Sequence, residues 1–414
     1  MLLVGGKLKY YMEIKSNTTI RGIGMPYLAN KNECKGCSAC VSACRRRCLQ
    51  MKTDAYGFAF PFLMNPNQCV HCRKCEKTCP VLRSVDTMNR EPEAYAAYSL
   101  DEMIRLDSSS GGVFTEISVS IIKDEGCIWG ASYNNNFAVE HICIETEAEL
   151  WKLRGAKYAQ SKMNDCFRKV KTALERGRKV LFSGTPCQVA GLRSFLQKDY
   201  DNLLCIDFVC HGVPSPMVWE KYVQYRANAD NNGTLPRYIN LRCKDSGWSR
   251  YSYSVDFHYQ DATRYICRNS EDIFMRLFIN DYILRKSCSA CQFKGYNRVS
   301  DITLGDFWGI WDIKPEMDDN KGTSLVLIHS LKGKNMLNSI SNKIMSQQVT
   351  LEQASRMNRS LLQSSAHKTS REEMLDTIAD NGFQFTQASL QQKNNLTESI
   401  INKTRRIVKK LFSI

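Results

Sequence analysis

The sequence predicts a fold in two parts, one of α+β and one of α/β character. A compact cysteine-rich segment occupies residues 31–85, and short apolar runs alternate with helical segments from residue 93 onward. Strand, helix, strand, helix in succession is typical of parallel β–α units, and a hairpin pattern near their start adds antiparallel strands. We therefore expect a small N-terminal module followed by a larger α/β domain with a mixed sheet.

The composition is that of an ordinary globular protein apart from its 19 cysteines. The 414 residues suffice for one large domain or for two to three smaller ones. Disulfide frameworks belong to short secreted chains, whereas this long sequence shows no secretory signal at its start. It also has no apolar run of about 18 residues, so no membrane span is expected. We expect a protein of the reducing cytoplasm whose cysteines are ligands or buried thiols.

Two cysteine runs with the spacing C-x-x-C-x-x-C-x-x-x-C lie within the first fifth of the chain. Their ligand candidates are Cys34, Cys37, Cys40 and Cys44 in the first run, and Cys69, Cys72, Cys75 and Cys79 in the second. This spacing suits a [4Fe-4S] cluster, and in two-cluster ferredoxins the fourth cysteine of each run binds the other cluster. We therefore expect a bacterial ferredoxin-like module in which Cys79 completes the first cluster and Cys44 the second.

Zinc is the alternative metal for these cysteines. A zinc site needs four ligands, usually as two separated pairs, and two runs of four exceed that need. The first run departs from the ferredoxin pattern, because Arg45-Arg46-Arg47-Cys48 follows where a proline is usual. Cys48 is thus a spare thiol that competes with Cys44 or is simply buried, and His71 we interpret as a loop residue.

The formal net charge of +15 by itself favours an acidic partner, an anionic membrane surface or nucleic acid. Cluster-bound thiolates carry more charge than the iron–sulfide core neutralises, so the loaded protein is less basic. No RNA-recognition signature or finger-type histidine pair is present, and we expect no nucleic-acid partner. The basic segment Thr404–Phe412 is interpreted as a terminal helix, either solvated or in peripheral contact with an anionic membrane.

The α/β part follows a lead-in at 1–30, the cysteine module and a polar linker at Ser84–Pro92. The expected elements are a hairpin of 126–133 and 138–144, strands at 179–183, 203–209, 302–304 and 324–328, strand-like alternation at 237–268 with Tyr251, Tyr253, Val255 and Phe257 on one face, and helices at 113–122, 188–196, 217–226 and 273–284. These segments place the main domain at 93–330. The polar stretch 331–414 is expected to be a helical C-terminal region.

Four further cysteines are candidates for another thiolate set. Cys187 and Cys210 each follow an expected strand, and Cys288 and Cys291 form a C-x-x-C pair. Ligands of α/β folds collect at the carboxyl ends of parallel strands. The two single cysteines should therefore be neighbours, with the pair folded back over the same edge. By spacing alone the set holds zinc, holds a cluster, or consists of four buried thiols.

Five motifs occur in order along the chain: Ser108–Gly112, Arg154–Tyr158, Ser183–Gln188, Cys210–Pro216 and Ser300–Gly309. Across roughly residues 30–330 they resemble the coenzyme F420 hydrogenase/dehydrogenase beta-subunit family. The resemblance implies FAD, iron–sulfur clusters and electron transfer with a deazaflavin or another two-electron substrate. Plant 7-hydroxymethyl chlorophyll reductase shares this core. Bacterial relatives with a ferredoxin module look associated with surface-polysaccharide gene clusters.

Residue chemistry agrees with a flavin site in two loops. The candidates are Ser109, Ser110, Gly111, Gly112, Gly184 and Thr185. The serine–glycine loop offers hydroxyls and unhindered amides to phosphate, although it would equally form a helix-capping turn. The second loop, at a strand end, is placed to contact the isoalloxazine ring.

Two residues are catalytic candidates. Lys157 would hold a flavin phosphate or a substrate acid, and its alternative is an ordinary surface lysine. His211 would donate a proton, and its alternative is a structural partner of the neighbouring cysteine. Asp306 and Trp308 are expected either to orient the flavin or to pack.

We therefore expect a flavin- and iron–sulfur-dependent oxidoreductase. Reduced ferredoxin or a similar one-electron donor would load the N-terminal clusters, and a third cluster would relay electrons to FAD. The flavin would deliver a hydride equivalent to an unknown small-molecule acceptor. The alternatives are an electron-transfer adaptor subunit without its own substrate and a zinc-stabilised nucleic-acid-binding protein.

Overall fold

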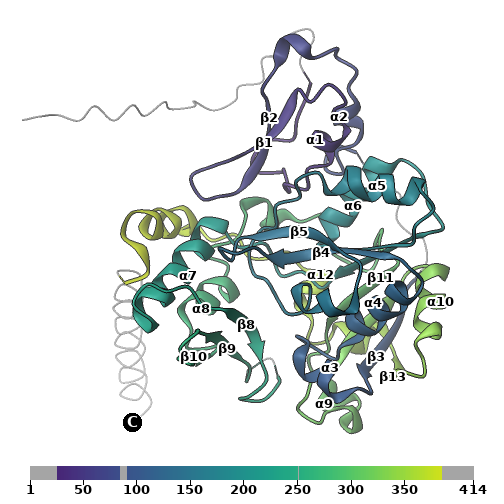
Figure 1. Cartoon of the computed structure of the whole chain (residues 1–414), viewed down its shortest axis with the longest axis vertical. Helices are drawn as coiled ribbons and strands as arrows, with labels where there is room; N and C mark the ends of the chain where they lie inside the picture. The colour runs from purple at the N-terminus through teal and green to yellow at the C-terminus, as the bar shows by residue number, and fades with distance from the viewer. Residues whose placement is uncertain (1–25, 84–90, 250, 385–414) are drawn as a thin grey trace, which may run out of the picture.

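The computed structural model describes residues 26–83, 91–249 and 251–384 (Figure 1). A small N-terminal module lies at one end, above a large α/β domain built around a long sheet. The lead-in and the linker lie largely, and the basic segment 404–412 entirely, outside the described residues. Across the described ranges, no helix is both long enough and apolar enough to cross a membrane.

The N-terminal module consists of two cysteine loops, each followed by a short helix, and one hairpin. Helix α1 (Ala39–Ala43) follows the first loop and α2 (Lys74–Lys77) the second. Strands β1 (Leu49–Thr53) and β2 (Ala59–Leu63) pair antiparallel, and the 3-10 helix η1 (Pro66–Gln68) leads into the second cysteine run.

The two cysteine loops have matching backbone conformations. The residues on either side of the second cysteine are left-handed in both runs: Gly36 and Ser38 around Cys37 (φ 71 and 65), and His71 and Arg73 around Cys72 (φ 50 and 55). Two left-handed residues in close succession wind the chain tightly, so each loop brings its cysteines close together.

One eight-stranded mixed sheet organises the large domain, in the order β13-β3-β12-β11-β7-β6-β4-β5. Its strands are β3 (Glu93–Ser99), β4 (Cys127–Tyr133), β5 (Val139–Ile144), β6 (Val180–Ser183), β7 (Leu203–Phe208), β11 (Ile302–Asp306), β12 (Ser324–Ile328) and β13 (Ile344–Val349). Strands β11, β7, β6 and β4 run parallel in the middle, and antiparallel strands flank them on both sides. The expected mixed sheet is therefore confirmed.

Helices cover both faces of this sheet, so its central strands are largely apolar. Helices α5 (Cys166–Glu175) and α6 (Pro186–Leu196) pack on one face, and α4 (Val113–Lys123) and α10 (Leu331–Ser339) on the other. Consistent with this, every residue from Val180 to Phe182 in β6 is fully buried. The other elements are α3 (Glu102–Asp107), α7 (Pro216–Asp230), α8 (Ile273–Ile279), α9 (Ile310–Ile313), α11 (Leu351–Ser355), α12 (Arg359–Leu362), η2 (Glu147–Lys152), η3 (Lys286–Ala290) and η4 (Pro315–Met317).

A second, three-stranded antiparallel sheet of β8 (Tyr238–Cys243), β9 (Ser254–His258) and β10 (Arg264–Arg268) packs against α7 and α8. Its core is aromatic: the ring of Tyr222 stacks on Phe274 and meets Phe257 edge to face. Tyr253, Val255 and Phe257 are buried as expected, but Tyr251 lies before β9 and is 66% exposed. The expectation that Tyr251 shares this buried face is wrong.

The helix expected at 273–284 is α8, which stops at Ile279. Asp281 takes the left-handed conformation (φ 67), and the chain then pairs Leu284 with Pro214 in an isolated bridge. A second difference lies in the C-terminal region, which was expected to be helical and also supplies strand β13. β13 pairs with β3, an internal strand of the sheet for which no strand was predicted.

Candidate functional site

The eight cysteines of the N-terminal module divide between two cavities. One small cavity is lined by Cys34, Cys37, Cys40 and Cys79. The other, of about 190 Å³, is lined by Cys44, Cys69, Cys72 and Cys75. The fourth cysteine of each run thus lies with the first three of the other run, which is the grouping that the sequence predicts.

Burial makes free thiolates unfavourable in the first cavity. It raises the pKa of Cys37 and of Cys40, and the neighbouring Cys34 and Cys79 raise both further by charge repulsion. In the second cavity, burial raises the pKa of Cys75 to about 11. Four thiolates at such close quarters require a positive centre between them, as an iron–sulfide core provides.

A fifth cysteine lies in the second cavity. Cys48 is 2% exposed, lines this cavity, and its backbone N–H donates to Cys44 Sγ at 3.3 Å. His71, interpreted from sequence as a loop residue, also lines the cavity, with Nδ1 4.0 Å from Cys69 Sγ. Both residues therefore lie close to the candidate ligands.

Cys187, Cys210, Cys288 and Cys291 come together from three parts of the chain. Cys187 follows β6 at the start of α6, and Cys210 follows the adjacent parallel strand β7. Burial raises the pKa of Cys187 to about 12, with further contributions from nearby Cys291 and Cys288. Burial also raises the pKa of Cys210, and the other three thiols add to that rise. The structure therefore gathers the predicted set at one sheet edge.

The short helix α8 explains how the C-x-x-C pair reaches this edge. After the chain turns at Asp281, the Arg285 N–H donates to the Val213 carbonyl at 2.8 Å, beside the Cys210 loop. Helix η3 then carries Cys288, and Cys291 follows it. Within the described ranges, no three His, Cys, Asp or Glu side chains converge closely enough to hold a single metal ion.

The first module cavity adjoins the four-cysteine edge. The charge of Cys187 raises the pKa of Cys37, so the two thiolate sets interact electrostatically. Gly191 in α6 makes this approach possible, because a Cβ at this position would lie 2.9 Å from Cys37 Sγ. No side chain thicker than hydrogen fits between α6 and the cysteine loop.

Buried hydrogen bonds fix the module to the large domain. The Arg285 guanidinium, 2% exposed, donates to the carbonyls of Cys34 and Ala59 and to Gln160 Oε1 at 2.7–3.0 Å. In return, Lys35 Nζ donates to the Ser287 carbonyl at 2.6 Å. The contacts join the first cysteine loop to the segment that carries Cys288.

A cavity of about 1,030 Å³ opens beside the four cysteines. Its walls are the loops that follow β6, β7 and β11, the 154–158 loop and the serine–glycine loop at 108–112, and Cys187 and Cys210 lie in its wall. Loops after neighbouring parallel strands meet at one sheet edge, so Ser108 and Asp306, from motifs 198 positions apart, share this space.

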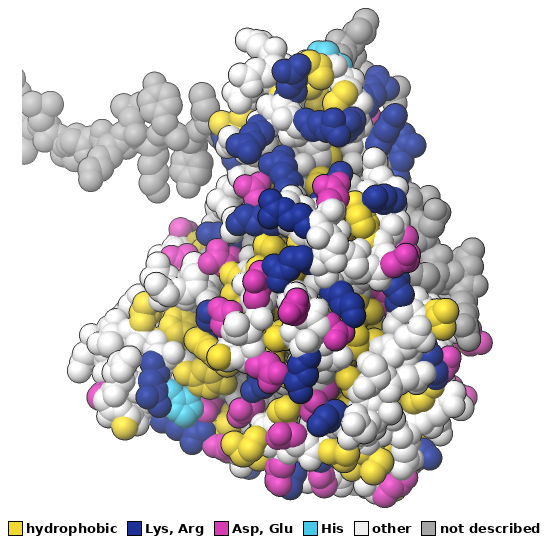
Figure 2. All heavy atoms as spheres, turned by 45° about the vertical axis from the view of Figure 1, so that its right-hand side comes forward, with side chains coloured by type: hydrophobic (Ala, Val, Ile, Leu, Met, Phe, Trp, Pro, Cys, Tyr) yellow, Lys and Arg dark blue, Asp and Glu magenta, His cyan; other side chains and the backbone are white. Residues whose placement is uncertain are grey.

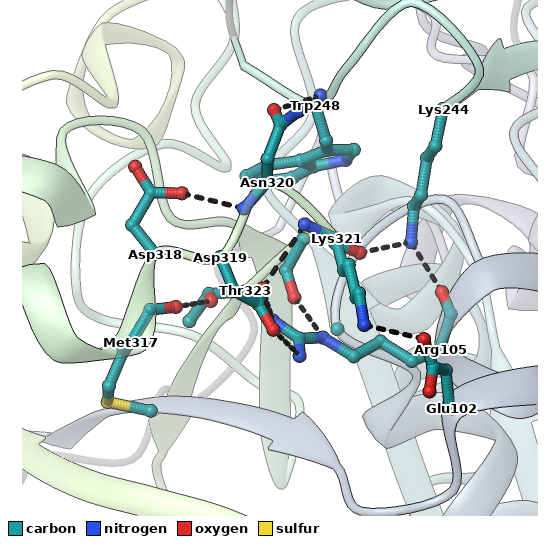
Figure 3. A network of polar contacts seen from close by, with 12 residues as sticks. Glu102, Arg105, Lys244, Trp248, Met317, Asp318, Asp319, Asn320, Lys321 and Thr323 are labelled. Carbon is teal, nitrogen blue, oxygen red and sulfur yellow. Dashed lines mark hydrogen bonds and ion pairs between the residues drawn. The ribbon is translucent and has the colours of Figure 1, made fainter.

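The serine–glycine loop is held from behind by a polar network (Figure 3). Lys244 Nζ donates to the carbonyls of Arg105, Ser110 and Lys321, and the Arg105 guanidinium pairs with both carboxylate oxygens of Asp319. The Trp248 indole donates to the Ser109 carbonyl at 3.0 Å. Burial lowers the pKa of Lys244 to about 7.

Not every residue of this loop faces the cavity. Gly112 lines the cavity and caps α4 in the left-handed conformation (φ 86), and the buried Ser109 Oγ has no hydrogen-bond partner among the described residues. Ser110 Oγ donates to the Thr323 carbonyl. Gly111 is absent from the cavity wall, because its N–H donates to Ser324 Oγ and a Cβ would clash with the Ala97 carbonyl. The proposed cofactor role of Gly111 is replaced by a packing role.

Gly184 and Thr185 also lie in the cavity wall, and Thr185 has a local role. Its side chain and that of Gln188 form a capping box at the start of α6, and Thr185 Oγ1 lies 3.1 Å from Cys187 Sγ. The hydroxyl thus contacts a candidate ligand sulfur.

The two catalytic candidates line the same cavity. Lys157 Nζ donates to the carbonyls of Leu153, Arg154 and Gly155, and burial lowers the pKa of its ammonium to about 7. His211 Nε2 lies 2.7 Å from Asp281 Oδ1. Each is therefore held in a defined orientation by partners in the wall.

Two family models match the chain. Residues 177–354 match the C-terminal region of the coenzyme F420 hydrogenase/dehydrogenase beta subunit, and residues 33–82 match a 4Fe-4S dicluster domain. The chain therefore carries a region similar to the C-terminal part of this beta subunit together with a 4Fe-4S dicluster domain. With both regions in one chain, it is an iron–sulfur electron-transfer protein related to the hydrogenase/dehydrogenase subunits.

Among solved structures, this chain is similar to a chain of the F420-reducing [NiFe] hydrogenase complex from Methanosarcina barkeri. The identity is 13% and the TM-score 0.45, over 71% of this chain and 92% of that chain. No curated protein matches.

Several residues of this beta-subunit relative that shape the site carried no sequence signal. Arg242 pairs with Asp306 at 2.6 Å and lies over the Trp308 ring, so Asp306 is held by a cation rather than free. Arg285 and Lys244 belong to no recognisable sequence pattern, and only the carbonyl oxygens around them reveal a positioning role. No spacing rule would have found them.

Proposed function

We propose that this chain is an iron–sulfur flavoprotein oxidoreductase that passes electrons from a one-electron donor through [4Fe-4S] clusters to FAD and a two-electron acceptor. The observation that carries the proposal is the shared cavity of about 1,030 Å³, whose wall includes Cys187, Cys210, Lys157 and the serine–glycine loop. A cavity of this size suits a large organic cofactor and a substrate. An adaptor subunit would have no need of such a space.

The residues at the serine–glycine loop fit the phosphate part of FAD. Helix α4 has 11 residues and begins at Gly112 without a side-chain cap, so its first N–H groups are open to an anion. Ser109 Oγ is a buried hydroxyl without a partner among the described residues. Lys244 holds the loop carbonyls away from this anion site. When bound, FAD would supply two-electron chemistry.

The cysteines fit three [4Fe-4S] clusters. We assign one cluster to Cys34, Cys37, Cys40 and Cys79, one to Cys44, Cys69, Cys72 and Cys75, and the third to Cys187, Cys210, Cys288 and Cys291. Support comes from the two module cavities and from the mutual pKa effects of the last set. The close approach of Cys37 to α6 supports an uninterrupted route to the large cavity.

Lys157 and His211 are proposed to handle charge and protons. An ammonium with a pKa of about 7 can carry or release a proton near neutrality. His211 is oriented by Asp281 and exposes its ring to the cavity, as a proton donor must. The acceptor is a small molecule, and the gene-cluster association of relatives makes surface-polysaccharide metabolism the context to screen.

Anaerobic reconstitution of the full chain tests this function. We expect about twelve irons per chain from three four-iron clusters, and a fluorescent flavin released by acid. Stoichiometric zinc in place of iron would favour the nucleic-acid alternative. Iron without any flavin uptake would refute the flavoenzyme and favour the adaptor, whose cofactors would be clusters alone.

A further inference from the structure

We propose that the second module cavity marks the entry point for electrons, and that the surface around it docks an acidic one-electron carrier protein. The inference rests on the proposed function, because it assumes a cluster on Cys44, Cys69, Cys72 and Cys75. It adds which cluster is loaded first, on which surface, and by what kind of partner.

The two module cavities differ in their distance from solvent. In the first, Cys34, Cys37 and Cys40 are buried at 8% exposure each, and the large domain closes over them through Arg285. In the second, Cys72 is exposed. Cys79 of the first set is only partly exposed, so the second set is the more accessible of the two to an external protein.

Cationic side chains surround the exposed set. Arg45, Arg46, Arg73 and Lys74 line its cavity, no acidic residue does, and Arg47 and Lys77 lie next to them in sequence. All six are exposed, and none forms an ion pair with any other described residue. Figure 2 shows the same concentration of Lys and Arg over the upper part of the molecule, where the N-terminal module lies. Unpaired cations on one face favour a partner of opposite charge.

The positive charge survives loading with clusters. Residues 26–83 contain ten Lys or Arg and three Asp or Glu, a net charge of +7. A [4Fe-4S] core with four thiolates carries about two negative charges, so two clusters leave the module at roughly +3. Moreover, its exposed cations lie around the second cysteine set and not beside the buried first set.

An apolar side chain among these cations supplies contact area. Val70 lies between the ligand candidates Cys69 and Cys72, lines the cavity and is 57% exposed. A charged rim around a small apolar patch is the usual make-up of a transient electron-transfer interface. The partner that fits this surface is an acidic carrier protein of the ferredoxin type.

Binding of an oxidised, acidic plant-type [2Fe-2S] ferredoxin to the reconstituted full chain tests the proposal without any turnover. Replacing Arg45, Arg46 and Arg73 together with Glu should weaken binding at least tenfold at low salt, and the matching Gln variant should lie between. Wild-type affinity should fall steeply with salt, whereas the Glu variant should lose that dependence. As a control, Lys123, Arg176 and Lys343 are exposed cations of the large domain outside the cavity wall, and their triple change to Glu should leave binding intact.

Reduction kinetics provide the second readout. Reduced ferredoxin should load the Glu variant at least tenfold more slowly than wild type, while reduced methyl viologen, a small cation, should load it no more slowly. Unchanged ferredoxin binding in the Glu variant would overturn the docking surface. So would salt-sensitive binding to DNA without binding to ferredoxin. If methyl viologen reduces the wild type and ferredoxin does not, this inference falls and the proposed function stands; if the chain takes up no iron, the proposed function itself fails.

Discussion

Single side chains decide which sulfur atoms can share a centre. Cys187 and Cys210 are 23 positions apart in sequence, and they come together only because their two strands end at the same edge of the sheet. Thr185 adds a hydroxyl contact at 3.1 Å to the Cys187 sulfur. Hydrogen bonds to cluster sulfurs shift reduction potential, so Thr185 belongs to the electronic surroundings of the third set.

Replacing Cys187 or Cys291 with Ser should remove the third cluster. Iron in the reconstituted full chain should fall by about four atoms per chain, because a [4Fe-4S] core lost from one site takes all its irons with it. Iron analysis with low-temperature EPR of the reduced protein measures this. Cys205→Ser is the control: Cys205 is buried in β7 away from the set, and its change should leave the iron content unaltered. Equal iron in all three variants would contradict the assignment.

Cys48 should be able to replace Cys44 as a ligand. Its side chain lines the same cavity and its pKa is raised, first by burial and then by the charge of Cys44, which places the two sulfurs together. We expect Cys44→Ser to keep about eight module irons and the Cys44→Ser/Cys48→Ser variant to lose about four. The iron content of the two variants shows whether Cys48 replaces Cys44 as a ligand. Equal loss in the single and double variants would show Cys48 to be only a buried thiol.

At the scale of elements, short helices and tight turns orient the candidate cysteine ligands. Left-handed residues flank the second cysteine of each module run, and an early end of α8 redirects the chain toward the sheet edge. Helix α6 carries Cys187 in its first turn and Gly191 one turn later. Helix α6 therefore supplies a candidate ligand, Cys187, and leaves room for the cysteine loop of the module at Gly191.

Gly191→Ala should damage the contact between α6 and the module. The new Cβ would lie 2.9 Å from Cys37 Sγ and 3.0 Å from Cys37 Cβ, and an iron-bound cysteine is unable to move away. Overpacking of this kind costs about 1–3 kcal/mol, more than the roughly 1 kcal/mol that alanine gains over glycine in a helix. Denaturant unfolding of the loaded protein should show a net loss. Ser194→Ala, on the same helix and partly exposed, should be nearly neutral; a more stable Gly191→Ala variant would disprove the close approach.

At the scale of the whole molecule, two units are joined so that their thiolate sets adjoin. The module contributes Lys35 and the Cys34 carbonyl, and the large domain contributes Arg285, Gln160 and Ser287. The Gln160 contact joins residues 125 positions apart, and the Arg285 and Ser287 contacts join residues 251 to 253 positions apart. They are buried and polar, so their geometry fixes the relative position of the two units more tightly than an apolar patch would.

Replacing Arg285 with Met should loosen this junction. The substitution keeps apolar volume but leaves the Ala59 carbonyl and the Gln160 amide oxygen without the Arg285 donor, each at a cost of about 1–3 kcal/mol. The Cys34 carbonyl loses one of its two donors and keeps the hydrogen bond from Ser287 Oγ. We expect separate unfolding transitions for the module and the large domain, seen as early loss of module cluster absorbance during denaturation. Arg264→Met is the control, since Arg264 pairs on the remote sheet β8–β10. A single transition as in the wild type would show that other contacts suffice.

The sequence by itself determined the local chemistry of this protein. The cysteine spacing indicates two clusters because three thiolates on one tight loop are a local arrangement, set by a few neighbouring residues. The apolar runs at 180–183 and 203–208 predict buried parallel strands for the same reason, since both faces of each strand are covered. Turn residues and helix caps were likewise readable where they act within a few positions.

Only the tertiary structure decided which distant groups meet. Strand β3 is alanine-rich and was missed, because its strand character comes from pairing with β12 and β13 rather than from its own residues. Gly111 seemed a cofactor glycine until packing against Ala97 and Ser324 accounted for it. Arg285 bonds to residues some 125 to 250 positions away. Such contacts depend on the path of the whole chain, and no window of sequence contains it.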